Sequence, residues 1–165
     1  MTCKNCSIKP VWQFTNQTKL CKNCFSDYFE RKIFKAIRKY NMLPRDKIFT
    51  LKKDSSLNTA VLKKVIEKKF TVKFSPNPRF SSENLSQISE KIFSEILHGK
   101  FAKSNQNNQP LYSCSNKEIE LYAKLNNIDG EKRKQDKKIQ ALFSKFMKKN
   151  QDLEINILRA SEQLN

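Results

Sequence analysis

The spacing of apolar side chains predicts helices over most of the chain. Between residues 25 and 40, Ile33, Ile37 and Tyr40 recur at i, i+4 and i+7 among basic residues, which is typical of an amphipathic helix. Further helices are predicted over residues 57–69, 82–99, 115–125, 132–149 and 153–164. Ser115 and Glu118 have the spacing of a capping box, so we expect the helix of residues 115–125 to begin there.

Two short segments have the pattern of strands. Residues 48–51 are an apolar run between charged residues, and residues 70–74 alternate in polarity. The helix of residues 57–69 lies between them, so a parallel pair joined by a crossover helix is expected. A polar segment rich in Asn and Gln, residues 103–109, predicts a linker. The expected fold class is α+β, mostly helical, with two or three strands in its core.

Charge is the most unusual property of the composition. The 165 residues include 33 Lys and Arg against 16 Asp and Glu, a net charge of +17, while 12 Phe and 4 Tyr can fill a core and argue against a disordered chain. No apolar run reaches the roughly 20 residues that a membrane span requires, and no secretory signal opens the chain, so we expect a cytoplasmic protein without a membrane partner. The positive excess favours a nucleic acid partner, although a basic surface without a specific partner is the alternative.

The helix near residue 33 carries the densest positive charge. Because its basic side chains fall on the face opposite the apolar one, that face could follow a phosphate backbone or could simply be solvated. The predicted nucleic-acid-binding residues are Arg31, Lys32, Lys35, Arg38 and Lys39.

Four of the five cysteines have the spacing of a metal site. Cys3 and Cys6 form one Cys-x-x-Cys pair, and Cys21 and Cys24 form a second. Two such turns can place four sulfurs in a tetrahedron about 2.3 Å from Zn²⁺, and residues 11–20 between them can form the hairpin of a zinc ribbon. Two disulfides or an iron–sulfur cluster are the alternatives. We expect a structural zinc site and no iron–sulfur cluster.

The N-terminal segments also resemble a known family, the archaeal and eukaryotic cytoplasmic tRNA 2-thiolation proteins of the PP-loop ATP pyrophosphatase type. The resemblance begins with the two Cys-x-x-Cys pairs and continues in order along the chain. The matching segments are residues 20–25, 28–32, 37–40, 46–49, 82–100, 110–112, 117–123 and 153–159. It implies an N-terminal zinc ribbon, an α/β PP-loop core and a helical C-terminal part. Its implied partners are tRNA, a full-length thiolase subunit and a ubiquitin-like sulfur carrier.

The chain departs from the family where the family performs catalysis. Lys53, Asp54 and Ser55 stand where the family has Ser-Gly-Gly-Lys-Asp-Ser, and they would be the residues that bind ATP. Glycine allows backbone N–H groups to approach a phosphate closely, and residues 51–55 contain none. A basic turn followed by a helix cap is the alternative for this segment. The internal cysteines of the family are also missing, since only Cys114 lies outside the ribbon, and we expect it to be inert.

These observations predict a shortened, degenerate member of the family. The predicted regions are a zinc ribbon over 1–28, a linker helix with an eroded α/β core over 29–109, and a helical region over 110–165. The expected function is that of a zinc-binding, tRNA-binding, non-catalytic component of tRNA 2-thiouridine synthesis. The alternatives are a minimal ATP-dependent tRNA sulfurtransferase that uses Lys53, Asp54 and Ser55, and an unrelated zinc-ribbon protein that binds nucleic acid.

Overall fold

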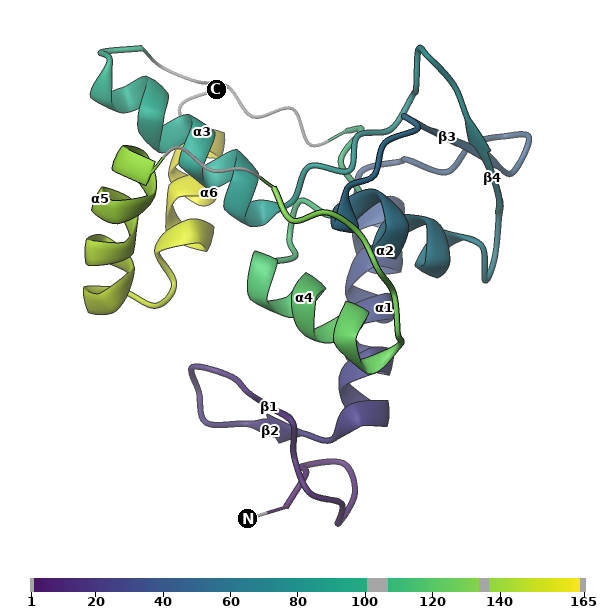
Figure 1. Ribbon diagram of the computed structural model, residues 1–165, viewed down its shortest axis with the longest axis horizontal. Coiled ribbons are helices and arrows are strands. Elements are labelled where there is room, and N and C mark those ends of the chain that lie inside the picture. The colour runs from purple at the N-terminus through teal and green to yellow at the C-terminus, as the bar shows by residue number, and fades with distance from the viewer. Residues whose placement is uncertain (1, 101–106, 134–136, 164–165) are drawn as a thin grey trace.

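Six helices and two small sheets make up the described part of the chain, which comprises residues 2–100, 107–133 and 137–163 of the computed structural model (Figure 1). The strands are β1 (Trp12–Gln13), β2 (Lys19–Leu20), β3 (Ile48–Leu51) and β4 (Thr71–Phe74). The helices are α1 (Lys22–Lys39), α2 (Leu57–Ile66), α3 (Leu85–Leu97), α4 (Asn116–Leu125), α5 (Lys137–Lys149) and α6 (Leu153–Gln163). The predicted α+β, mostly helical fold class is confirmed. Among the described residues, no helix combines the length and apolarity that crossing a membrane requires.

The strands β3 and β4 form the expected parallel pair. Ile48 lies opposite Thr71 and Leu51 opposite Phe74, and α2 connects the two strands as a crossover helix. The sheet has two strands in the described residues because the segment after β4 returns along the far side of β3 and enters α3. The predicted βαβ unit is therefore confirmed, and in the part of the chain that the structure describes its sheet has two strands where two or three were expected.

The main core lies between α1, α2, α4 and this sheet. Phe29 of α1 is fully buried and stacks on Tyr122 of α4 with their ring centroids 4.5 Å apart. The ribbon residues Cys3 and Leu20 belong to the same buried cluster as these rings. Because α1 runs from the ribbon into the core, the ribbon is continuous with the core and its position is set by one rigid helix (Figure 1).

A second, smaller core joins α3 to the two C-terminal helices. Leu85, Ile88 and Ile92 of α3 bury their side chains against Leu158 of α6. The helix α5 adds Phe143, whose ring centroid lies 5.3 Å from that of Phe93. These three helices form a group beside the α1, α2 and α4 group in Figure 1.

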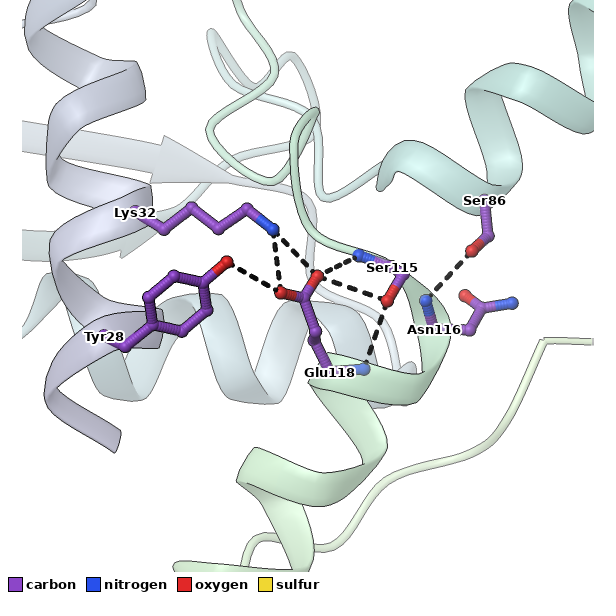
Figure 2. A network of polar contacts seen from close by, with 6 residues as sticks. All are labelled: Tyr28, Lys32, Ser86, Ser115, Asn116 and Glu118. Carbon is purple, nitrogen blue, oxygen red and sulfur yellow. Dashed lines mark hydrogen bonds and ion pairs between the residues drawn. The ribbon is translucent and has the colours of Figure 1, made fainter. Parts of the chain in front are cut away.

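A buried carboxylate connects the helices of the main core (Figure 2). Glu118 of α4 accepts hydrogen bonds from Lys32 Nζ at 2.8 and 2.9 Å and from Tyr28 Oη at 3.3 Å, both on α1. It also accepts a 2.8 Å bond from the backbone N–H of Ser115, the N-cap of α4. The capping box expected from the sequence therefore exists, and its carboxylate also holds α1.

Several helix ends differ from the predicted ones. The helix α1 begins at Lys22 rather than at residue 25, α3 ends at Leu97 rather than at residue 99, and residues 132–133 lie outside any helix. We expected the third helix to be capped near Ser82, but Asn84 and Gln87 form the capping box of α3. Ser82 instead accepts hydrogen bonds from α2: its hydroxyl from Thr59 Oγ1 at 2.8 Å and its carbonyl from Asn58 at 3.1 Å. The helix α2 ends at Ile66, before the predicted residue 69. Residues 103–106 of the predicted linker, and parts of the predicted helices at 134–136 and 164, lie outside the described residues.

The Glu118 pair should make a large contribution to stability. Replacing Glu118 by Ala leaves the Lys32 ammonium, 22% exposed, without its carboxylate, and we expect this to cost about 3 kcal/mol of unfolding free energy, measured in urea. The matched control is Glu120→Ala on the same helix, which removes an exposed pair with Lys132 and should cost less than about 1 kcal/mol. Equal losses in the two variants would contradict the role of the Glu118 network.

Candidate metal centre and basic surfaces

The two Cys-x-x-Cys turns meet at the start of α1. Cys3 and Cys6 lie on the loop before β1, Cys21 is the N-cap of α1 and Cys24 lies in its first turn. The β1–β2 hairpin brings the turns together, with Lys4 N–H donating to the carbonyl of Lys19 at 2.9 Å. All four sulfur atoms lie within 4.8 Å of one another.

This sulfur geometry fits a single metal ion. A tetrahedron of sulfurs 2.3 Å from a central ion has edges of about 3.8 Å. The Sγ of Cys6 lies 3.4 Å from that of Cys21 and 3.8 Å from that of Cys24. In a four-iron cluster each thiolate binds a different iron, which holds the sulfurs farther apart. The four cysteines can therefore hold a metal, and their spacing favours one ion.

The polar environment of the sulfurs also suits bound thiolates. Burial raises the pKa of Cys3, but backbone N–H groups of neighbouring residues outweigh burial and lower that pKa to about 6. The side-chain hydrogen bond to Cys21 and burial raise the pKa of Cys24 to about 12, and the negative charge of Cys21 raises it as well. A cation at the centre of the four sulfurs would offset this negative charge and favour the deprotonated form of all four.

Aromatic rings connect this metal centre to the core. The ring of Trp12 lies 5.3 Å from that of Phe25, and the ring of Phe14 lies 4.9 Å from that of Tyr28. Tyr28 is also a donor to Glu118. The ribbon is thus held by side chains of α1 that are themselves fixed to α4.

The predicted basic face of α1 is present, with one exception. Arg31, Lys35, Arg38 and Lys39 are exposed, and the first three follow i, i+4 and i+7 spacing along one stripe. Lys32 points away from this stripe to Glu118, which neutralises its charge. Sequence reasoning could not separate Lys32 from its neighbours, because its partner lies 86 residues away.

Lys53, Asp54 and Ser55 form the turn between β3 and α2. All three are exposed. Asp54 accepts hydrogen bonds from the backbone N–H of Ser56 at 3.0 Å and from its hydroxyl at 2.7 Å. Burial tends to raise the pKa of Asp54, but these bonds and Thr59 lower it below its usual value. Ser56 is the N-cap of α2 and accepts from Thr59 N–H, as the helix-cap alternative expected.

A distant segment, which includes Gly130 and Glu131, covers the N-terminus of α2, and this contact was not predicted. The N–H of Leu57, the first residue of α2, donates to the carbonyl of Glu131 at 2.9 Å, and Glu131 N–H donates to the carbonyl of Ser55 at 2.7 Å. Gly130 lies so close that a Cβ atom there would stand 2.6 Å from Leu57 Cα. The one available signal was that Gly130 is one of only two glycines in the chain.

Cys114 lies apart from the metal centre and is fully buried, as expected for an inert thiol. Burial raises its pKa to about 12, so the thiol stays protonated at neutral pH.

Comparison with known proteins identifies the fold. No family model matches the sequence, and no curated protein matches it. Among solved structures, the U34-tRNA thiolase NcsA from Methanococcus maripaludis, which carries a [4Fe-4S] cluster, is similar, with a TM-score of 0.75 and 13% sequence identity. The match covers 99% of this chain and 87% of that one. The chain therefore has the same fold as this solved structure over nearly its whole length.

Substitution of Gly130 tests whether the segment of residues 130–131 covers the N-terminus of α2. In Gly130→Ala the new Cβ would meet backbone atoms of Leu57, so the segment must move, and we expect a loss of about 1–3 kcal/mol of unfolding free energy. Amide hydrogen exchange of Leu57 and Glu131 should become faster, because their hydrogen bonds depend on the contact. In the control, Gly99→Ala, nothing lies within 4 Å of the new Cβ; the positive φ of 69° strains the backbone there, but the Leu57 and Glu131 amides should stay protected. Unchanged exchange in Gly130→Ala would contradict the tight contact.

Proposed function

We propose that this protein is a zinc-binding, tRNA-binding component of tRNA 2-thiouridine synthesis and acts as a non-catalytic subunit beside a full-length thiolase. The observation that carries the proposal is a thiolase fold over nearly the whole chain whose α2 N-terminus is occupied by the chain itself. The shared fold supports a role in tRNA 2-thiouridine synthesis. The occupied helix end supports the absence of catalysis. A ubiquitin-like sulfur carrier would then act on the partner subunit.

The occupied helix end explains why the chain would not activate ATP. A phosphate at a helix N-terminus is bound by backbone N–H groups that have no partner within the helix. Here the Leu57 N–H donates to Glu131 and the Thr59 N–H to the Ser56 side chain. The loop before the helix contains no glycine that would let its backbone wrap around a phosphate. Lys53, Asp54 and Ser55 are thus remnants of an ATP site in this proposal.

The basic stripe of α1 supports tRNA as the partner. Arg31, Lys35 and Arg38 repeat along a helix at a spacing that can follow neighbouring phosphates. They belong to a chain with a net charge of +17, which favours association with a polyanion. Lys39 extends the stripe and lies 4.9 Å from the ring of Tyr40.

We infer that the metal is zinc in a structural role. Four thiolates around one ion leave no open coordination position, so such a site holds a fold together and performs no chemistry. The competing assignment is an iron–sulfur cluster, because the similar thiolase carries a [4Fe-4S] cluster.

The metal content separates these assignments. Elemental analysis of the protein as purified without added metal should give about one zinc and no iron per chain. Four irons per chain with visible charge-transfer absorption would contradict the zinc proposal. Alkylation gives a second measurement: a chelator should expose four thiols to reagent, whereas Cys114, fully buried, should react only after the protein unfolds.

Binding of tRNA should depend on the α1 stripe. Changing Arg31, Lys35 and Arg38 to Ala removes three phosphate contacts, and we expect the slope of log K against log salt to fall by about 2–3. The matched control changes Lys137, Lys145 and Lys148 of α5, which removes the same charge elsewhere. Equal losses in both variants would assign the binding to net charge and contradict the stripe.

Loss of the gene should remove or reduce 2-thiouridine in tRNA, measured by mass spectrometry of nucleosides. Loss of an unrelated zinc-ribbon protein would leave the modification unchanged.

Calorimetry with ATP and Mg²⁺ should detect no binding. Binding that Asp54→Ala abolishes would instead support the minimal sulfurtransferase.

A further inference from the structure

The carboxyl ends of β3 and β4 form one continuous surface. The N–H of Ser75, directly after β4, donates to the carbonyl of Leu51 at 2.9 Å. The loop that follows crosses to the far side of β3, where Arg79 N–H donates to Thr50 Oγ1 at 2.8 Å. Ligands of α/β proteins bind at this edge of the sheet. Because the helix end at this edge is occupied, side chains must supply any contact there.

Phe74 differs from the neighbouring aromatic side chains because its ring is exposed. Two other aromatic rings near this edge, Phe49 of β3 and Phe80 in the segment after β4, are buried and stack on each other with centroids 4.5 Å apart. Phe74 is 45% exposed at the last position of β4. The ammonium of Lys63 on α2 lies 5.7 Å from its ring centroid. The structure therefore fixes an aromatic ring at the edge and leaves much of it in contact with solvent.

The segments that form this edge of the sheet are rich in positive charge. Residues 45–79 contain ten Lys and Arg and three acidic residues. Each of the three carboxylates already has a partner: Asp46 accepts from Ile48 N–H, Asp54 from Ser56, and Glu67 pairs with Lys63 at 3.7 Å. Lys52, Lys53, Lys73 and Arg79 are exposed along the edge. The ten cations outnumber the three carboxylates in these segments, so the surface has an excess of positive charge for an anionic ligand.

We propose that Phe74, with Lys52, Lys53 and Arg79, binds a single-stranded segment of RNA at the carboxyl end of the sheet. The ring stacks on an unpaired base, and the cations contact the phosphates on either side. A duplex keeps its bases stacked on one another and offers no face to the ring. This inference rests on the proposed function, since it names the part of a tRNA, a loop or an unpaired end, that this surface would hold.

Binding of a labelled oligouridine of about 12 nucleotides, followed by fluorescence anisotropy, tests the inference. Phe74→Ala should weaken binding by about 5- to 150-fold, because one stacked base is lost. Phe74→Tyr keeps the ring and should bind as tightly as the wild type. The matched control is Phe146→Ala on α5, where a ring with 47% exposure is removed and no loss is expected. A blunt RNA duplex of the same length should bind Phe74→Ala and the wild type equally well.

The outcomes separate this inference from the proposed function. Unchanged oligouridine binding in Phe74→Ala, or an equal loss for the duplex, would overturn the stacking site. If tRNA binding still depends on the α1 stripe in that case, the proposed function stands without this site. A wild-type protein that binds neither tRNA nor oligouridine would overturn both.

Discussion

The arrangement of this protein depends on the buried carboxylate of Glu118. It joins Lys32 and Tyr28 of α1 to the first turn of α4 (Figure 2), and the N–H of the adjacent Asn116 donates to Ser86 of α3 at 2.9 Å. The Glu118 side chain thus joins α1 to α4, and the backbone of the same first turn of α4 is bonded to α3. Because a buried charge is costly without its partner, loss of either side chain of the Lys32–Glu118 pair is expected to destabilise this arrangement. Glu118 also directs Lys32 into the core, so Lys32 is not part of the exposed basic stripe of α1.

A second constraint acts at the N-terminus of α2. In an α/β fold this helix end is the natural position for a phosphate, because its N–H groups have no partner within the helix. The contact of Gly130 and Glu131 with Leu57 supplies that partner from the chain itself. The absence of a side chain at Gly130 permits the close approach. Two residues of the chain itself thus occupy a helix end that could otherwise bind a phosphate.

Because backbone N–H groups at the N-terminus of α2 are occupied, we expect exposed side chains to make the contacts with a ligand. The four cysteines could hold a metal in the ribbon, the aromatic contacts of Trp12 and Phe14 fix the ribbon to α1, and α1 presents Arg31, Lys35 and Arg38 to solvent. At the other end of the main core, Phe74 and its neighbouring cations form a second basic surface. Two such surfaces on one rigid core suit a long, folded polyanion better than a small ligand.

The sequence by itself determined the features that depend on neighbouring residues. Apolar periodicity placed β3, β4 and most helices, the Ser115 and Glu118 spacing placed the start of α4, and paired Cys-x-x-Cys motifs placed the metal centre. Only the tertiary structure decided which side of α1 Lys32 occupies, that Ser82 serves α2 while Asn84 caps α3, and that Gly130 covers Leu57. The physical reason is range: helix periodicity and capping act over a few residues, whereas these contacts join segments that meet only after the chain has folded.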